Sequence, residues 1–208
     1  FPHVFINILS PRELVGSDKK KRLAEIKNLL LDTYYEAGLS RHSLFSSLAR
    51  SAKTHKMLGK IVEDITGMTL SYRQLLTKVF ALASIIHKLS TSDGRIGIML
   101  PNTCAGVVAF FACQLLGKQT CMINYTSGAK SIVSAINFAN IELIISSRRF
   151  VSNADLQKVA EEIEKHTRLF YLEEARQSIG LFEKIRSAAA AIFPLTAARQ
   201  MYGDIEPT

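Results

Sequence analysis

The chain has 208 residues, of which 48% are hydrophobic and 21% charged, and this composition excludes a collagenous, low-complexity or generally disordered protein. The formal net charge is +8, and the first 60 residues hold 11 basic and 5 acidic side chains. A basic first quarter is typical either of a chain that meets an anionic surface or of a solvated lysine run. Aromatic residues do not interleave with the basic run, so we expect no nucleic-acid partner.

The chain opens on Phe1 within an apolar run, and residues 1–9 are predicted to form a buried strand. No basic segment followed by an apolar core is found there, so we expect no signal peptide. The longest nearly unbroken apolar run, residues 104–116, has 13 residues and contains Gln114, whereas a helix that spans a bilayer needs about 20. We therefore expect a soluble chain without a membrane-spanning helix.

Two helices are predicted after this strand. The first begins at a cap on Ser17 or Asp18 and extends to Glu36, and the second covers residues 42–56. Their apolar stripes are Leu23, Ile26, Leu30 and Tyr34 in the first helix and Leu44, Phe45, Leu48 and Ala52 in the second. We interpret residues 1–58 as the closing part of one domain together with a linking helix.

A second domain is predicted over residues 59–208, opening with a short hairpin around Thr66-Gly67. Ser71 and Gln74 have the spacing of a capping box, which starts a helix. The apolar positions of that helix are Leu75, Leu76, Val79, Phe80, Leu82, Ala83 and Ile86. A turn is expected at Ser92-Asp93-Gly94.

Strands and helices then alternate. Strands are predicted at residues 95–100, 119–123, 141–146 and 168–172. Helices are predicted at residues 104–116, 129–139 and 153–165, and the tail over 173–199 is expected to be helical with breaks near Gly180 and Pro194. This alternation predicts βαβ units, and the short apolar strands predict helices on both faces of the sheet. The fold class is therefore α/β, a doubly wound and mostly parallel sheet.

No catalytic motif is found in the chain. None of the five histidines is followed five residues later by an acidic residue, so the H-x-x-x-x-D pair of glycerolipid acyltransferases is absent. The patterns G-x-S-x-G, G-x-x-x-x-G-K-[ST] and H-E-x-x-H are absent as well. The three cysteines are Cys104, Cys113 and Cys121. Because their number is odd and none has C-x-x-C spacing, we expect buried free thiols in a reducing compartment.

Three polar groups allow both a structural and a functional interpretation. Thr126-Ser127-Gly128-Ala129-Lys130 lies between a strand and a helix, where Ser127 can cap the helix or the segment can hold an anion. Arg148-Arg149 follows a strand, where ligands of α/β sheets bind, but it also suits a solvated surface. His87, near a helix end, is expected to be a packed residue and not a base.

A fourth polar group is the basic run that begins the first helix: Lys19, Lys20, Lys21 and Arg22. The helix dipole disfavours cations at this position, which suggests an anionic partner such as lipid phosphate. A solvated helix face is the alternative.

Several segments, taken in order, resemble the AMP-forming acyl synthetases. Residues 70–76 are similar to the T/S-Y-x-x-L segment that leads into the first helix of that family. Residues 95–102 are similar to its V-x-x-x-L-P-N strand, and residues 107–112 to its next helix. The resemblance covers about residues 60–208.

Two further segments, residues 122–128 and 144–148, most resemble members of that family in which a phospholipid acyltransferase domain precedes the synthetase. Residues 1–58 look more loosely like the end of such an acyltransferase domain. The resemblance implies an enzyme that activates a fatty acid with ATP and Mg²⁺ and loads it on acyl carrier protein. It also implies transfer of the acyl group to the 2-position of a lysophospholipid at the cytoplasmic face of the inner membrane.

The family's functional residues do not lie within this chain. Its Ser/Thr/Gly-rich phosphate loop, its Y-x-x-T-E motif, its ribose-binding Asp and its carboxyl-terminal Lys have no match in residues 1–208. We therefore assign no catalytic, cofactor-binding or metal-binding residue and expect an inactive segment across a domain junction. The alternatives are a stand-alone adaptor that docks on anionic membranes and a small α/β enzyme that uses residues 126–130 as an anion site.

Overall fold

A computed structural model describes residues 18–38, 43–90 and 94–203 of the protein. The chain divides into two compact units, Phe1–His42 and Ser43–Thr208. The strand expected at residues 1–9 and the turn residues Ser92 and Asp93 lie outside the described residues. Each unit is described by itself.

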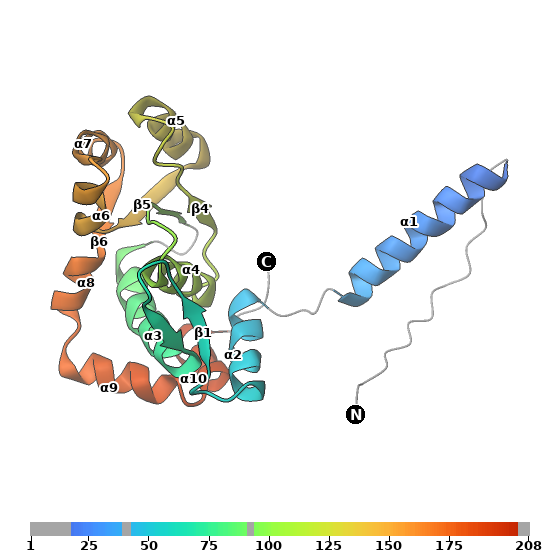
Figure 1. The fold of residues 1–208 in the computed structure, drawn as a ribbon, viewed down its shortest axis with the longest axis horizontal. Coiled ribbons are helices and arrows are strands. Elements are labelled where there is room, and N and C mark those ends of the chain that lie inside the picture. Colours follow the sequence, from blue (N-terminus) through green and yellow to red (C-terminus); the bar gives the residue numbers. More distant parts are fainter. Residues whose placement is uncertain (1–17, 39–42, 91–93, 204–208) are drawn as a thin grey trace. The chain divides into compact units, whose positions relative to one another are not determined.

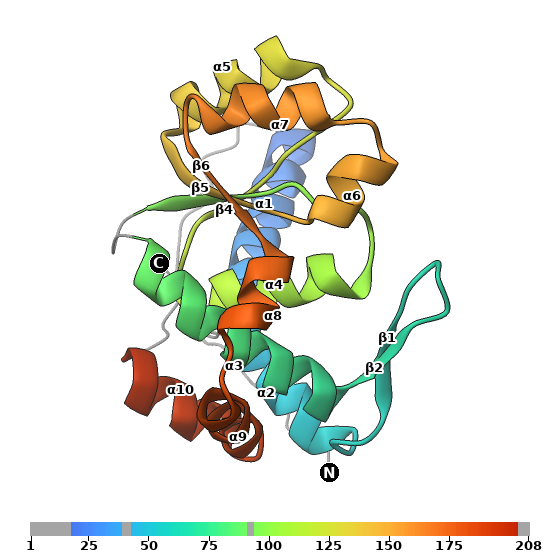
Figure 2. The same cartoon turned by 90° about the vertical axis from the view of Figure 1, so that its left-hand side faces the viewer.

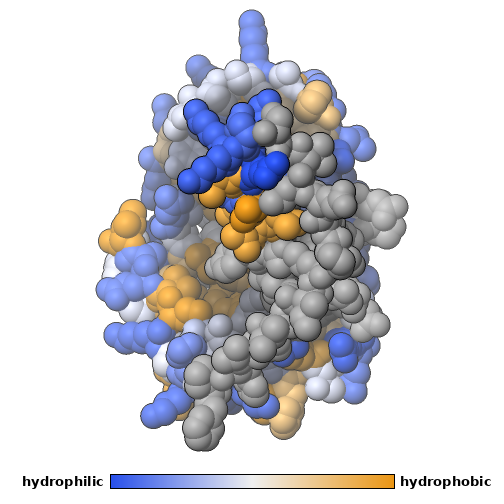
Figure 3. Space-filling model, turned by 90° about the vertical axis from the view of Figure 1, so that its right-hand side faces the viewer, coloured by the Kyte–Doolittle hydropathy of each residue, from blue (hydrophilic) through white to orange (hydrophobic). Residues whose placement is uncertain are grey.

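The first unit contains one described helix, α1 (Lys19–Gly38), at the position that the sequence predicts. The Asp18 carboxylate caps it, accepting a hydrogen bond from the backbone nitrogen of Lys21 at 2.8 Å. The apolar side chains Leu23 and Leu30 are exposed on this helix. Figure 3 shows a hydrophilic cluster beside hydrophobic atoms on the part of the surface that α1 forms.

The second unit is built on a four-stranded parallel sheet in the order β4-β3-β5-β6. Its strands are β3 (Arg95–Ile98), β4 (Thr120–Met122), β5 (Ile141–Ser146) and β6 (Arg168–Tyr171). Helices α3 (Tyr72–Leu89) and α4 (Cys104–Leu115) cover one face, and α5 (Ala129–Ala139) and α7 (Gln157–Glu164) cover the other (Figures 1 and 2). The predicted doubly wound α/β fold is confirmed.

Alternation along the strands separates two apolar cores. On β5, Leu143 and Ile145 belong to the core beneath α3 and α4, while Ile144 belongs to the core beneath α5 and α7. All three side chains are fully buried, because helices shield both faces of a parallel sheet from water. Gly97 on β3 leaves room for its neighbours, since a Cβ there would lie 2.8 Å from Cγ1 of Ile144.

Helix α2 (Leu44–Thr54), which we expected to link two domains, packs into the core of the second unit. The Phe45 ring meets the Phe80 ring of α3 edge to face, with centroids 5.8 Å apart. Leu48 and Ala52 are buried as expected, whereas Leu44 is 55% exposed, so its assignment to the apolar stripe was wrong. Its position as the first residue of the helix, after the Ser43 cap, turns it away from α3 and α4.

The predicted hairpin and capping box are both present. Strands β1 (Lys60–Glu63) and β2 (Thr69–Ser71) pair antiparallel, and Gly67 supplies the positive φ of 76° that the turn requires. The Ser71 hydroxyl accepts from the Gln74 backbone nitrogen, and the Gln74 side chain accepts from the Ser71 nitrogen. This box begins α3, whose predicted apolar positions are all buried.

The segment between β5 and β6 differs from the prediction. Of the single helix expected over residues 153–165, the structure forms residues 157–164 as α7, and an additional short helix, α6 (Arg148–Asn153), precedes it. Asp155 has a φ of 52°, a left-handed conformation that interrupts a right-handed helix. Ser147 caps α6 directly after β5, where the sequence analysis assigned neither helix nor strand.

The tail is helical with the two predicted breaks. Helices α8 (Leu172–Ser178) and α9 (Leu181–Ala190) are separated at Gly180, and α10 (Pro194–Tyr202) begins with Pro194 in its first turn. Helix α9 packs on α3, and α10 packs against α2 and α9. None of the described helices combines the length and apolar character that a membrane crossing requires.

Candidate functional site

The carboxyl ends of β3 and β5 form the switch point of the sheet. The chain leaves β3 toward α4 on one face and leaves β5 toward α6 and α7 on the other, and ligands of open α/β sheets bind at such a point. Here the two strand ends are tied together, because the buried Ser146 hydroxyl donates to the carbonyl oxygen of Met99 at 2.9 Å. The polar groups around this point come from the segments that follow β5 and β6.

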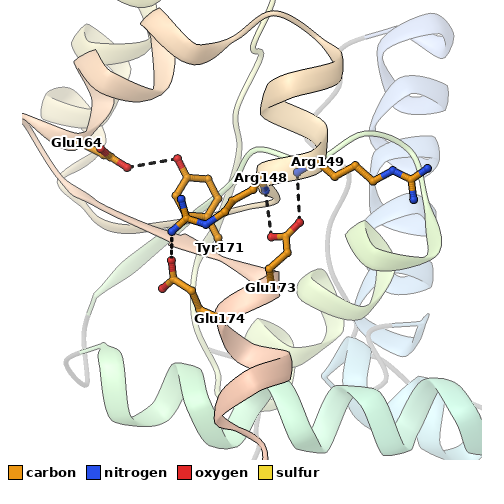
Figure 4. A network of polar contacts seen from close by, with 6 residues as sticks. All are labelled: Arg148, Arg149, Glu164, Tyr171, Glu173 and Glu174. Carbon is orange, nitrogen blue, oxygen red and sulfur yellow. Dashed lines mark hydrogen bonds and ion pairs between the residues drawn. The ribbon is translucent and has the colours of Figure 1, made fainter.

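The N-terminus of α6 is occupied by a carboxylate of the chain itself (Figure 4). Glu173 accepts hydrogen bonds from the backbone nitrogens of Arg148 at 3.0 Å and Arg149 at 3.3 Å. It also accepts from the Ser147 hydroxyl at 2.8 Å. A helix N-terminus attracts an anion through its open N–H groups, and here Glu173 supplies that anion.

The environment of Glu173 favours its charged form. Partial burial acts to raise the pKa of its carboxyl, but the hydrogen bonds from Arg148, Ser147 and Arg149 outweigh it and lower the pKa below its ordinary value. The carboxylate therefore stays ionised and keeps its place at the helix end. A phosphate group would have to displace it.

The Arg148 side chain is likewise engaged within the chain. Its guanidinium carbon lies 4.2 Å from the centroid of the Tyr171 ring, and Nη2 lies 2.6 Å from Oε1 of Glu174. The Tyr171 hydroxyl donates to Oε1 of Glu164 at 3.3 Å. Burial, and then the charge of Glu164, raise the pKa of Tyr171, so its hydroxyl stays protonated at neutral pH.

The side chain of Arg149 points away from this network (Figure 4). Of the pair Arg148-Arg149, the first is therefore a structural partner of Tyr171 and Glu174, and the second is an exposed surface residue. This geometry matches the structural interpretation of the pair better than the ligand interpretation.

The loop after β4 is held by Asn124 and not by Ser127. Oδ1 of Asn124 accepts from the nitrogen of Thr126 at 3.2 Å and from its hydroxyl at 2.7 Å. The predicted Ser127 cap is wrong: the Ser127 hydroxyl donates to the Asn124 carbonyl, and Gly128 is the N-cap residue of α5. Lys130 is exposed.

The two candidate segments lie close together in the fold. The rings of Tyr125, before the first, and Phe150, after the second, meet edge to face with centroids 4.9 Å apart. Apolar packing therefore joins the loop after β4 to α6. The basic run of Lys19, Lys20, Lys21 and Arg22 belongs to the other compact unit, where it is exposed in the first turn of α1.

A second carboxylate that holds two segments together is that of Asp64, at the tip of the hairpin. Its Oδ1 accepts from the nitrogen and hydroxyl of Thr66 and from the nitrogen of Met68, and its Oδ2 accepts from the nitrogen of Cys104, the first residue of α4. These bonds, led by that from the Thr66 hydroxyl, hold the pKa of Asp64 well below its usual range. Beside Asp64, a cavity of about 360 Å³ is lined by residues of the hairpin, of the segment 101–103, of α4 and of β4.

Two cysteines and His87 are held in packed surroundings. Burial raises the pKa of Cys113 to about 12 and raises that of Cys104, so both thiols are protonated at neutral pH. The His87 ring packs against the ring of Tyr202, with centroids 5.5 Å apart, as expected for a packed residue. In the described part of the chain, no cluster of three or more His, Cys, Asp or Glu side chains is placed to hold a metal ion.

The sequence did not single out the carboxylates that organise this region: Asp64, Glu173 and Glu174. The sequence does contain a signal for Glu173: two acidic residues, Glu173 and Glu174, follow one residue after β6, and the carboxyl ends of β5 and β6 lie at the same edge of the sheet. Asp64 precedes a turn by two residues, where an aspartate side chain commonly accepts bonds from the turn backbone. Glu173 and Asp64 each tie two segments of the chain together through backbone hydrogen bonds, and Glu174 pairs with Arg148.

Comparison with known proteins identifies the fold. A family model described as "AMP-binding enzyme" matches residues 48–194. Structural similarity extends to VinN in complex with 3-methylaspartate, with a TM-score of 0.55 and 19% identity over 73% of this chain and 39% of that one.

Two further structures give the same result. A benzoate CoA ligase from Burkholderia xenovorans LB400 has a TM-score of 0.56 and 20% identity over 67% of this chain and 29% of its own. The N-terminal domain of FACL13 from Mycobacterium tuberculosis has a TM-score of 0.56 and 16% identity, over 67% of this chain and 37% of that one. The chain thus spans less than half the length of the proteins to which it is similar.

Proposed function

The chain belongs to the AMP-binding enzyme family, and from this premise we propose that it forms part of an enzyme that activates a carboxylic acid as an acyl-adenylate. Enzymes of this family use ATP and Mg²⁺. One observation carries the proposal: the family match over residues 48–194 includes the whole four-stranded parallel sheet and the helices on both of its faces.

Two motifs that suggested the family occupy structurally defined places, which supports the proposal. Ser71, in the first motif, forms the capping box with Gln74 at the start of α3. Leu100-Pro101-Asn102 follows β3 at the switch point of the sheet, between that strand and α4. The first motif fixes where a core helix begins, and the second ends a core strand.

We further propose a fatty acid as the substrate, acyl carrier protein as the acceptor, and a lysophospholipid as the final acyl acceptor. The enzyme of this kind is the bifunctional 2-acylglycerophosphoethanolamine acyltransferase/acyl-[acyl-carrier-protein] synthetase at the inner membrane. The support is the similarity of residues 122–128 and 144–148 to such members and the looser similarity of residues 1–58 to the end of an acyltransferase domain. The similar solved structures include ligases of benzoate and of long-chain fatty acids, so the fold alone does not select the acid.

We propose that the 208-residue chain by itself does not form an acyl-adenylate. Glu173 fills the helix N-terminus at the switch point, and Arg148 is paired with Glu174. The sequence also lacks the phosphate loop of the family. We therefore assign no reaction step to the described residues.

The test is acid-dependent ATP–pyrophosphate exchange, measured in parallel on the 208-residue chain and on the product of the whole reading frame that contains it. We expect exchange with fatty acids from the product of the reading frame and none from the 208-residue chain. Transfer of the acyl group is then compared between acyl carrier protein and coenzyme A. Absence of acid-dependent exchange from the reading-frame product would overturn the family-level proposal.

The remaining outcomes address the finer proposals separately. Transfer only to coenzyme A would exclude the carrier-protein acceptor while leaving adenylation intact. Exchange with benzoate or aspartate but not with fatty acids would exclude the fatty-acid substrate. Exchange by the 208-residue chain would show that its own residues bind ATP productively, contrary to the proposed role of Glu173.

A second candidate is a membrane-docking adaptor, which the exposed surface of α1 favours. The basic residues Lys19, Lys20, Lys21 and Arg22 are followed on the same helix by the exposed apolar residues Leu23 and Leu30. Basic and apolar side chains together are typical of helices that lie at an anionic membrane surface. Reversal of the three lysine charges should weaken binding to phosphatidylglycerol vesicles, and unchanged binding would exclude this role.

A further inference from the structure

Helix α9 carries a row of large apolar side chains on the side opposite to its packing face. Ser187 and Ala190 of α9 are buried where the helix packs against α3. The side chains of Leu181, Phe182 and Ile185 are exposed on the other side. Ile185 follows Leu181 by four residues and Phe182 by three, so the three side chains lie together on the helix surface. Ile192 and Phe193 continue the exposed row in the connection to α10. We call these five residues the α9 stripe.

The side chains of the α9 stripe are largely surrounded by solvent. Phe182 is 77% exposed and Phe193 is 70% exposed, which requires that most of each ring stand clear of neighbouring atoms. Single exposed apolar residues are ordinary, but five large ones on one helix and its adjoining turn mark an interaction surface.

Positive charge gathers at the same end of the unit. Helices α2 and α9 adjoin through α10 (Figure 2). Together the three helices carry five basic side chains and one acidic side chain. The basic residues are Arg50, Lys53, Lys184, Arg186 and Arg199. The acidic residue is Glu183, which pairs with Arg186 at 2.7 Å. By contrast, α5, α6 and α7 on the other face of the sheet carry four basic and three acidic side chains.

We propose that the α9 stripe inserts into the surface of an anionic lipid membrane. Protruding phenylalanine, leucine and isoleucine side chains enter the boundary between headgroups and acyl chains, while the surrounding lysine and arginine side chains meet lipid phosphates. A second copy of the chain fits less well, because a symmetric contact through the stripe would bring the two basic ends together. The proposal rests on α9 and its surroundings, not on adenylate formation or on α1.

The sequence offers a direct optical test, because it contains no tryptophan. The variants Phe182→Trp and Phe193→Trp each place the single tryptophan of the chain in the stripe. The matched control is Phe138→Trp on α5, where the native ring is 93% exposed and lies on the opposite face of the sheet. With vesicles of phosphatidylcholine and phosphatidylglycerol, the two stripe variants should shift their emission to shorter wavelength, and the control should not.

Affinity provides an independent readout in the 208-residue chain. The double variant Phe182→Gln/Phe193→Gln should bind the anionic vesicles about tenfold more weakly or worse, since two buried aromatic side chains are lost from the lipid contact. Phe138→Gln should bind like the unmodified chain. Binding should also weaken as salt is raised and on vesicles of phosphatidylcholine alone, because the basic side chains act through charge.

Three results would overturn the proposal. The first is equal vesicle affinity of the unmodified chain and the double variant. The second is an emission shift of the same size at Phe138→Trp as in the stripe. The third is a concentration-dependent dimer that the double variant abolishes while vesicle binding is absent, since the stripe would then join two copies of the chain. Light scattering after gel filtration measures that dimer, and adenylate formation is assayed separately.

Discussion

The carboxylate of Glu173 accepts a hydrogen bond from the backbone nitrogen of Arg148, 3.0 Å away, and thereby joins the beginning of α8 to the beginning of α6. The two residues are 25 positions apart in the sequence. Replacing Glu173 by Ala removes the acceptor of three hydrogen bonds and leaves the α6 N-terminus without its anion. We expect a loss of about 1–2 kcal/mol in the free energy of unfolding, measured by urea denaturation.

The neighbouring carboxylate is the matched control for that variant. Glu174 makes an exposed ion pair with Arg148, and exposed pairs contribute about 0–1 kcal/mol. Glu174→Ala should therefore change the free energy of unfolding less than Glu173→Ala does. Equal losses for the two variants would show that Glu173 acts only as a surface charge.

The stabilising effect of Glu173 should depend on pH in a defined direction. Its pKa is lower in the folded chain than the ordinary value of 4.5, so the folded state favours the charged carboxylate. The stabilisation is then complete above pH 4.5 and is lost as the pH falls through the folded pKa. The difference in stability between the unmodified chain and Glu173→Gln should be largest at neutral pH and should shrink below pH 4.5. A difference that grows in acid would contradict the assignment.

Phe45 should be essential for the stability of the second unit. Its side chain is fully buried against Phe80, and its removal leaves a cavity between α2 and α3. Phe45→Ala is expected to lower the free energy of unfolding by about 3–5 kcal/mol. The adjacent, exposed Leu44 provides the control: Leu44→Ala should stay within about 0.5 kcal/mol. If both variants kept the stability of the unmodified chain, the packing of α2 against α3 would contribute little to the stability of the second unit.

Gly97 should be required by the packing of the central strand. A Cβ there would lie 2.8 Å from Cγ1 of Ile144 and 3.3 Å from Ile123, so Gly97→Ala is expected to destabilise the unit by about 1–3 kcal/mol. A double-mutant cycle with Ile144→Ala identifies the cause. Ile144→Ala should be less harmful in the Gly97→Ala variant than in the unmodified chain, because the overlap is relieved. Strictly additive effects would exclude this contact as the reason for glycine.

The three thiols should react at different rates. Cys104 and Cys113 are buried with raised pKa values, whereas Cys121 is partly exposed. In the native chain, a disulfide reagent such as dithionitrobenzoate should modify one thiol quickly and the other two on the order of 100-fold more slowly, through opening of the structure. Cys121→Ser should remove the fast phase, and urea should expose all three thiols. Three equally fast thiols would show that the α4 side of the core is open.

The elements that local patterns define were predictable from the sequence. Residues 129–139 and 141–146 form α5 and β5 at the predicted positions, because an amphipathic run followed by an apolar run leaves few alternatives. Helix α6 was not predicted, since six largely polar residues after a strand resemble a loop. Its formation depends on the Ser147 cap and on Glu173, which lies far along the chain.

The candidate site was the least predictable part for the same reason. The interpretation of Ser127 as a cap rested on position alone, whereas the structure gives the N-cap to Gly128 and the bonds of the loop to Asn124. The contact of Arg148 with Tyr171 and Glu174 joins segments that only the order of strands in the sheet brings together. Residue types could suggest a binding role for Arg148, but they could not reveal that its partners lie within the chain.

One carboxylate at the hairpin tip has a dynamic consequence. Because Asp64 holds the turn with Oδ1 and the first amide of α4 with Oδ2, the hairpin and the helix end share one anchor although they are 40 residues apart. Fraying of either element removes the anchor of the other. The tip and the first turn of α4 should therefore open together as one cooperative substructure, with a common free energy of local unfolding.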